Sequence, residues 1–290
     1  MFSGIYLIVN PTSGSYSPAR IDQAMGILAR HGIEPQLLET AGPVDASLFA
    51  ARICREQTSP LIIVAGGDGT VNGVLNGLEP GKAALAVLPV GTANVLAREL
   101  GIASLEDAAV RIARGETKAA TAGCVEGKGW RRLFILMAGV GFDGAVVAGV
   151  RLPEKRRFGK VAYLLSAVRC LRQGERDRLR VVAGGRTIGC HTVIVCNAAH
   201  YGGGVRIAPG ADLFRPDLRA VCITQGGAGP LVRLAARLLA GRKPDMRGVE
   251  TVTAQEFTID GTRPVQLDGD PFGSAPVTIR ALPGFVRVVV

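Results

Sequence analysis

The chain has 290 residues, 48% of them hydrophobic and 20% charged, with a formal net charge of +10. This apolar content excludes an intrinsically disordered chain, because it can offset the entropy lost on folding, and no apolar run approaches the about 20 residues of a membrane-spanning helix. The positive charge fits an anionic membrane surface or a phosphate-rich substrate, whereas the 5% aromatic content argues against a nucleic-acid groove, in which bases stack on aromatic rings.

Two domains are predicted from the length and from a change of pattern near residue 123. In residues 1–123, apolar runs at 5–10, 35–39, 61–65 and 84–88 alternate with helix-like segments at 17–31 and 44–56. This alternation predicts an α/β domain with a parallel sheet and helices on both faces. In residues 124–283, short β-prone runs such as 133–137 and 192–196 are separated by polar or glycine-rich turns. They predict a β-rich, mainly antiparallel, sandwich-like domain with helices at 159–172 and 229–240.

Six cysteines are scattered along the chain without a Cys-x-x-Cys pair, and the three histidines show no metal-ligand spacing. Most of the cysteines lie in apolar surroundings, which is typical of buried thiols. The pattern therefore predicts a protein of the reducing cytoplasm.

A glycine-rich turn at residues 66–70 follows the apolar run Leu61–Ala65 and leads into a helix-like stretch at 71–78. Glycines let backbone amides approach an anion, and the N-terminus of the following helix attracts its charge. The turn is neither a Walker A loop nor a dinucleotide-binding Gly-x-Gly-x-x-Gly motif. We interpret it as a phosphate-binding turn, and a tight strand-to-helix turn without a ligand is the alternative.

Two further turns follow apolar runs in the same way, at residues 10–14 and at residues 88–94. The carboxyl ends of parallel strands meet at one edge of a sheet, where open α/β sheets bind ligands. The three turns are therefore predicted to contribute to one site.

Together the turns resemble the diacylglycerol kinase catalytic-domain family, which includes diacylglycerol, sphingosine and ceramide kinases and bacterial lipid kinases. The motifs that carry the likeness are Asn10-Pro11-x-Ser13-Gly14, Gly66-Gly67-Asp68-Gly69-Thr70-x-Asn72 and Pro89-x-Gly91-Thr92-x-Asn94-x-x-Ala97-Arg98. It continues through residues 139–143, 197–209 and 265–270 and so covers almost the whole chain in order. The layout is most like that of the bacterial lipid-kinase branch.

The resemblance implies an ATP-dependent kinase that transfers the γ-phosphate to a hydroxyl of a lipid such as diacylglycerol. The first domain, residues 1–123, would bind the nucleotide, and residues 124–283 would bind the lipid. The family also suggests that a last strand, residues 284–290, returns to the first domain. The residues that the resemblance assigns to the nucleotide are Asn10, Thr40, Gly66, Gly67, Asp68, Gly69, Thr70, Asn72 and Thr92.

Two carboxylates are candidates for the chemistry. Asp68 is the predicted ligand of a magnesium ion or its waters, because phosphoryl transfer requires the phosphate charge to be neutralised; a helix N-cap is its alternative role. The resemblance implies that Asp268, in Asp268-Gly269-Asp270, is the base that accepts the proton of the lipid hydroxyl. From the residues alone, Asp-Gly more often marks a hairpin turn, so this assignment depends on the family.

The chain departs from the family pattern in three places. Gly73 stands where the family often has Glu, and Asp270 is shorter than the usual Glu. Residues 215–218 also differ from a segment that the family associates with a second magnesium site. Metal geometry is therefore open, and no regulatory metal is predicted at Asp217.

A basic run at residues 151–160 precedes a helix-like segment with an apolar stripe. Either the run contacts anionic lipid headgroups at the inner face of the membrane, or it is a solvated loop beside a packed helix. The sequence supports both equally, and it leaves a homodimer open.

Two other functions stay open beside an ATP- and magnesium-dependent lipid kinase. A soluble-acceptor kinase of the NAD kinase or phosphofructokinase type would share the Gly-Gly-Asp-Gly-Thr turn. A non-catalytic nucleotide- or lipid-binding protein is compatible with Gly73.

Overall fold

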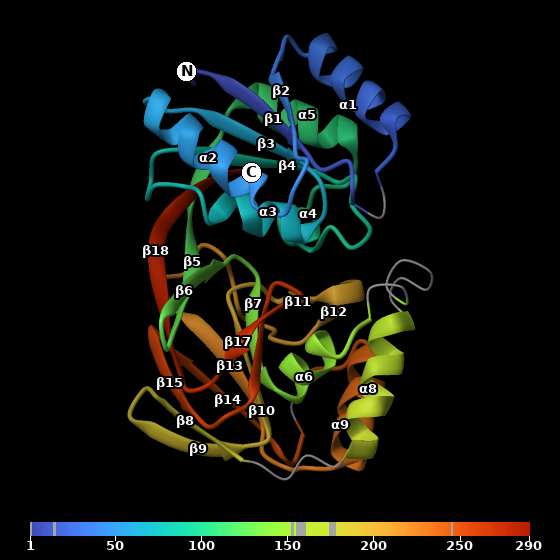
Figure 1. Ribbon diagram of the computed structural model, residues 1–290, viewed down its shortest axis with the longest axis vertical. Coiled ribbons are helices and arrows are strands. Elements are labelled where there is room, and N and C mark those ends of the chain that lie inside the picture. Colours follow the sequence, from blue (N-terminus) through green and yellow to red (C-terminus); the bar gives the residue numbers. More distant parts are fainter. Residues whose placement is uncertain (1, 14–15, 152–153, 155–160, 174–177, 245) are drawn as a thin grey trace. The chain divides into compact units, whose positions relative to one another are not determined.

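The computed structural model describes the chain except residues 1, 14–15, 152–153, 155–160, 174–177 and 245. It divides into two compact units, one formed by Met1–Ala122 together with Leu282–Val290 and the other by Gly123–Ala281. Figure 1 shows the course of the chain through both units. Among the described helices, none is long and apolar enough to cross a bilayer.

The first unit is a parallel sheet with the strand order β2-β1-β3-β4-β18, in which β18 contributes its last part. Its elements are β1 (Ile5–Val9), α1 (Pro18–Arg30), β2 (Gln36–Glu39), α2 (Asp45–Glu56), β3 (Leu61–Ala65), α3 (Asp68–Leu75), β4 (Ala84–Leu88), α4 (Val95–Glu99), α5 (Leu105–Arg114) and the start of β5 (Thr117–Gly127).

Helices cover both faces of this sheet, as its apolar strands require (Figure 1). Every residue of β3 and β4 is buried. Alternate residues of β3, among them Leu61 and Ile63, pack with α1 and α5 through side chains such as Leu28 and Ile112. Because helices pack on both faces of β3 and β4, the turns that follow these two strands are held in place.

The second unit consists of antiparallel sheets around one apolar core. One sheet has the order β14-β13-β10-β7-β16-β17, and the other runs β18-β15-β8-β9 with β5 and β6 attached. The core contains side chains from both sheets, including Val140 and Val193 from one and Phe257 and Ile279 from the other. This arrangement is a β-sandwich.

The elements of the second unit are β6 (Trp130–Phe134), β7 (Met137–Gly141), α6 (Phe142–Ala148), α8 (Val161–Gln173), β8 (Leu179–Ala183), β9 (Arg186–Cys190), β10 (Thr192–Cys196), β11 (His200–Tyr201), η1 (Gly202–Gly204), β12 (Val205–Arg206), β13 (Leu218–Ile223), α9 (Ala228–Leu239), β14 (Val249–Ala254), β15 (Glu256–Asp260), β16 (Pro264–Leu267), β17 (Asp270–Ser274) and the start of β18 (Val277–Val289).

The predicted fold class, a parallel α/β domain followed by an antiparallel sandwich, is confirmed. All six cysteines are buried free thiols, as their apolar surroundings indicated. Two local predictions were wrong. The run at residues 133–137 is not one strand, because β6 ends at Phe134 and β7 begins at Met137. The last strand, predicted at residues 284–290, is only the end of the longer strand β18, which begins at Val277.

Candidate active site

The glycine turn of the first unit joins β3 to α3 and lies against the turn that follows β4. A Cβ on Gly91 would lie 2.9 Å from both the carbonyl oxygen of Gly66 and the Cα of Gly67. A Cβ on Gly66 would lie 2.6 Å from Oγ1 of Thr70. At Gly67, by contrast, a Cβ would meet nothing within 4 Å. The two turns are thus in backbone contact, and Gly67 borders open space at the N-terminus of α3.

The third turn joins this pair through Asn10, which directly follows β1. Its side-chain nitrogen donates to Oγ1 of Thr70 at 3.2 Å, and its side-chain oxygen accepts from the amide and hydroxyl of Thr12 at 3.0 and 2.8 Å. Thr40 is buried, and its amide donates to the carbonyl of Val9 at 2.9 Å. Asn10, Thr40 and Thr70 therefore gather at one edge of the sheet, whereas Gly14 lies outside the described residues.

Asp68 is the first residue of α3, yet its carboxylate caps a different helix. Its two oxygens accept the amide N–H groups of Val95 and Leu96, both at 3.2 Å, at the start of α4. Burial raises the pKa of the Asp68 carboxyl, and these amide bonds act in the opposite direction. The capping role considered from the sequence is therefore realised on α4, across 27 residues of chain. No local pattern around residue 68 indicates that partner.

Asn72 and Gly73 lie inside α3, and both are buried. The side-chain oxygen of Asn72 accepts from the side-chain amide of Asn76 at 3.0 Å. A Cβ on Gly73 would be 3.0 Å from the Cβ of Ala46 in α2, so the absence of a side chain lets the two helices pack closely. A larger residue at this position would press on Ala46 of α2.

A hollow of about 520 Å³ borders the turn after β4 and is lined by Thr92, which is exposed, and by Arg20 and Arg98 among others. Arg20 donates to the carbonyl oxygens of Val90 and Pro89 at 3.2 and 3.3 Å, and so supports the turn from α1. Two cationic side chains therefore adjoin the edge at which the glycine turns lie. The hollow belongs wholly to the first unit.

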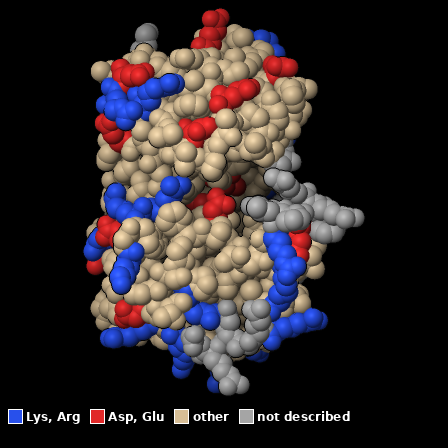
Figure 2. All heavy atoms as spheres, in the orientation of Figure 1, with Lys and Arg blue, Asp and Glu red and all other residues tan. Residues whose placement is uncertain are grey.

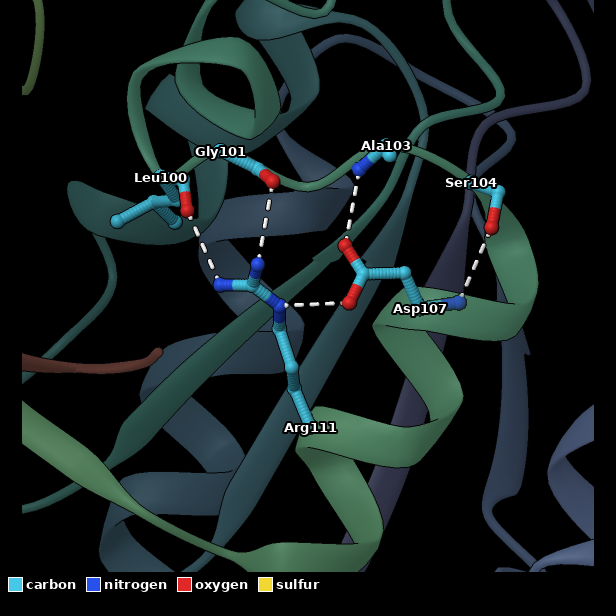
Figure 3. Close-up of polar contacts among 6 residues, drawn as sticks. All are labelled: Leu100, Gly101, Ala103, Ser104, Asp107 and Arg111. Carbon is cyan, nitrogen blue, oxygen red and sulfur yellow. Dashed lines mark hydrogen bonds and ion pairs between the residues drawn. The ribbon is translucent and has the colours of Figure 1, made fainter.

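The segment at residues 100–104, of which 101–104 line this hollow, is fixed by a pair of side chains on α5 (Figure 3). Arg111 donates to the carbonyl oxygens of Leu100 and Gly101, both at 3.1 Å, and to Asp107 at 2.9 Å. Asp107 in turn accepts the amide of Ala103 at 2.9 Å. Bonding to Arg111 lowers the pKa of Asp107, which keeps the pair charged.

A magnesium ion held by the protein alone does not fit these residues. Asp68 is a single carboxylate whose oxygens already hold α4, and no cluster of three His, Cys, Asp or Glu residues in the described chain could hold a metal. Farther along, both oxygens of Asp217 bond the guanidinium of Arg215 at 3.0 and 3.1 Å. An ion near Asp68 would need phosphate oxygens and waters for its other ligands, which is the usual way Mg²⁺ is bound with nucleotides.

Asp268, in the second unit, is held more tightly than a hairpin turn requires. One of its carboxylate oxygens accepts the amides of Leu136 and Met137 and the other that of Ile135, each at 2.9 Å. Its own amide donates to the carbonyl of Met137 at 3.0 Å, and its backbone is left-handed, with φ of 50°. These bonds explain why the run at 133–137 bends between β6 and β7: its amides turn toward the carboxylate.

Behind the Asp268 turn lies a buried polar network that the sequence analysis did not identify. The carboxylate of Asp143 accepts from the hydroxyl of Tyr201 and, at 2.7 Å, from the side-chain nitrogen of Gln266. The side-chain oxygen of Gln266 accepts the amide of Gly269 at 2.8 Å. Burial raises the pKa of Asp143, while the bonds from Tyr201 and Gln266 lower it. The network thus connects α6 and β11 to the residue next to Asp268.

Glycine makes room for this network in β7. A Cβ on Gly139 would lie 1.7 Å from a carboxylate oxygen of Asp143, so any larger residue there would expel the carboxylate. The quoted motifs at 139–143, 197–209 and 265–270 contain all of these residues, but their sequence positions give no hint that they bond one another. The structure brings them together through the pairing of β7 with β16, which carries Gln266, and with β10, which precedes Tyr201.

Comparison with known proteins agrees with this architecture. The model of the diacylglycerol kinase catalytic domain matches residues 4–125, and that of the YegS C-terminal NAD kinase beta sandwich-like domain matches residues 137–290. The chain belongs to the diacylglycerol kinase catalytic-domain family and is an enzyme of the diacylglycerol-kinase-like, lipid-kinase type. The resemblance read from the motifs is confirmed.

Relatives match along nearly the whole chain. A diacylglycerol kinase of Bacillus subtilis (strain 168) is 28% identical over 281 residues, which is 93% of this chain and 90% of that protein. A diacylglycerol kinase of Mycobacterium tuberculosis (strain ATCC 25618 / H37Rv) is 27% identical over 302 residues, 97% of this chain and 93% of that protein. A crystal structure described as a diacylglycerol kinase from Bacillus anthracis str. Sterne shares the fold, with a TM-score of 0.73, 18% identity and coverage of 99% and 97% of the two chains.

Proposed function

We propose that this enzyme transfers the γ-phosphate of ATP to a hydroxyl group of a membrane lipid such as diacylglycerol. The observation that carries the proposal is the contact between the two glycine turns of the first unit, where Gly91 packs on Gly66 and Gly67 and leaves Gly67 facing open space. Backbone amides at the start of a helix, with no Cβ in the way, are well suited to a polyphosphate. Family membership supplies the lipid-kinase class.

The turn residues would act on ATP by position and charge. Amides of the turn at residues 66–70 and the N-terminus of α3 would bind its phosphates, and Asn10 would keep Thr70 oriented through their 3.2 Å hydrogen bond. Asp68 would hold α4, and with it the turn containing Thr92, against the glycine turn. Magnesium bound with ATP would supply charge neutralisation, and the residues described here do not form a site for it without the nucleotide.

Asp268 would orient the lipid hydroxyl and take its proton as the phosphoryl group is transferred. General-base catalysis by a positioned carboxylate contributes about 10²–10⁴-fold to a rate. Three amide bonds fix the carboxylate, and the network through Gln266 fixes the neighbouring Gly269. We also propose that the reaction occurs on the cytoplasmic side of a membrane, where ATP and a lipid acceptor meet.

A soluble acceptor is the second candidate, because the second half of the chain matches a domain described as NAD kinase beta sandwich-like. Purified protein incubated with γ-labelled ATP would be offered diacylglycerol in mixed micelles or NAD in solution. Label in phosphatidic acid and none in the dinucleotide is the expected result. Label in the dinucleotide alone would overturn the lipid proposal, and ATP binding without transfer to any acceptor in a total lipid extract would identify a non-catalytic protein.

A further inference from the structure

Helix α9 has an exposed apolar face in the second unit. Leu239 is 79% exposed and Val232 is 58% exposed, although both are large aliphatic side chains. Together with Ala235 and Ala236 they follow helical spacing, so the four lie on one side of the helix. Leu234 is buried on another side. The helix is therefore apolar both on its buried side and where it meets solvent.

Positive charge borders this face. Arg233 is exposed within α9, and Arg242 and Lys243 are exposed just after it. Arg237 donates to the carbonyl oxygen of Lys243 at 3.4 Å, which ties the segment after the helix to its last turn. No aspartate or glutamate occurs from residue 225 to residue 244. An apolar face flanked by cations is typical of a helix that lies in a membrane interface.

Helix α8 provides an internal comparison. It also exposes aliphatic side chains, with Val161 at 52%, Leu165 at 41% and Val168 at 40%. Its Arg169, however, pairs with Glu154 at 2.8 and 2.9 Å, so that cation is neutralised. Figure 2 shows Lys and Arg side chains along the flank of the second unit on which Figure 1 draws the two helices. Of the basic run at 151–160, residues 152–153 and 155–160 lie outside the described residues.

We propose that α9 docks this enzyme on the surface of an anionic lipid bilayer. Leu239 and Val232 enter the boundary between headgroups and acyl chains, and Arg233, Arg242 and Lys243 lie at the level of the lipid phosphates. A second copy of the chain is a poorer occupant, because a two-fold contact would bring together two copies of the same cation-bordered surface. The charge of the surface thus favours phospholipid over self-association.

The position of α9 connects docking to the lipid-binding half of the enzyme. The helix packs against β12, which pairs with β11 through Tyr201 and Val205. Tyr201 is the residue that bonds Asp143 in the network behind Asp268. A helix on the membrane would therefore bring the unit that contains Asp268 to the acceptor. Docking itself requires no phosphoryl transfer, so it can be tested independently of the proposed reaction.

The test is co-sedimentation of the full chain with vesicles in the absence of ATP. Vesicles of phosphatidylcholine would be compared with vesicles containing about one third phosphatidylglycerol, at low and high salt. We expect binding only to the anionic vesicles, weakening as salt screens the charges. Replacing Arg233→Gln together with Arg242→Gln should weaken binding about 25-fold at low salt, because each cation near the surface contributes about fivefold.

Leu239→Gln should weaken binding severalfold at both salt concentrations, since it removes apolar burial rather than charge. The matched controls are Leu165→Gln and Arg172→Gln on α8, which should bind like the wild type. All of these positions are exposed, so thermal unfolding should not change. Equal binding to neutral vesicles, no binding at all, or equal losses from the α8 controls would overturn the proposal. A wild-type dimer in sedimentation velocity that Leu239→Gln dissociates would overturn it in favour of a self-interface.

Discussion

Asp68 in the first unit and Asp268 in the second both hold a distant segment through its backbone amides, but their surroundings differ. Each carboxylate accepts amide N–H groups from a segment distant in sequence, two from α4 for Asp68 and three between β6 and β7 for Asp268. Around Asp68 the site is shaped by glycines whose backbones touch. Beside Asp268 it is shaped by buried side chains that bond one another. The first site should therefore be sensitive to added bulk, and the second to lost polar groups.

The largest effect is expected for Asp268→Asn. Turnover should fall at least about 100-fold, because the base is lost and one amide of the segment 135–137 faces a side-chain NH₂ instead of an oxygen. ATP affinity, measured by calorimetry, should stay within about twofold of wild type. Asp270→Asn is the matched control, since Asp270 is exposed two residues away, and it should keep most activity. Equal activity of the two variants would remove Asp268 from the mechanism.

Gly91→Ala tests the sensitivity of the first unit to bulk. The new methyl group would press on Gly66 and Gly67 at 2.9 Å, and overpacking of this kind typically costs about 1–3 kcal/mol of unfolding free energy. The KM for ATP should rise because the turns separate, and urea unfolding should show the loss of stability. Gly26→Ala in α1, where a Cβ meets nothing within 4 Å, is the control; it should stabilise the protein by about 0.5–1 kcal/mol. An unchanged KM for Gly91→Ala would show that the contact between the two turns does not affect ATP binding.

Asp68→Asn should have a smaller effect. Val95 and Leu96 donate to different oxygens of Asp68, so the side-chain NH₂ of asparagine would face one of the two amides; a donor left without an acceptor costs about 1–3 kcal/mol, here at the lower end because these hydrogen bonds are only partly buried. Urea unfolding measures that cost. A magnesium titration of activity then separates two roles: a higher magnesium requirement would add metal contact to capping, and an unchanged requirement would leave capping as the whole role.

The last effect concerns the pH dependence of stability and is expected for Asp143→Asn. Burial raises the pKa of Asp143 in the folded protein above its ordinary value of 3.8, so the folded state binds a proton more tightly than the unfolded state does. Its contribution to stability is therefore present at low pH and is lost as pH rises through the folded pKa. The asparagine side chain of the variant cannot titrate, so its melting temperature should fall less than that of wild type as the pH rises above the ordinary carboxyl pKa of 3.8. Parallel curves for the two proteins would contradict this account.

Local pattern predicted the first unit better than the second, for a physical reason. The apolar runs of β3 and β4 and the glycines after them are signals within about ten residues, and parallel pairing brings their ends together without further information. The start of α3 at Asp68 rather than Val71 is a small error of boundary. The bend after Phe134 could not be predicted, because it depends on Asp268, more than 130 residues away. The Asp143 network could not be predicted for the same reason. Its residues come from four segments, namely α6, β11, β16 and the turn at Gly269, which meet only in the folded unit.

Strand β18 has a consequence for biosynthesis. Its last part pairs with β4, as Arg287 opposite Ala84 and Val288 opposite Leu85, although the whole second unit separates the two in the chain. During translation β4 is complete long before its neighbour emerges from the ribosome, so one edge of an apolar sheet waits unpaired, and such edges are prone to aggregation. The second unit can finish its core while the first is still open. A chain that ended at Ala281 would therefore contain every strand segment of the second unit but lack the neighbour of β4 in the first.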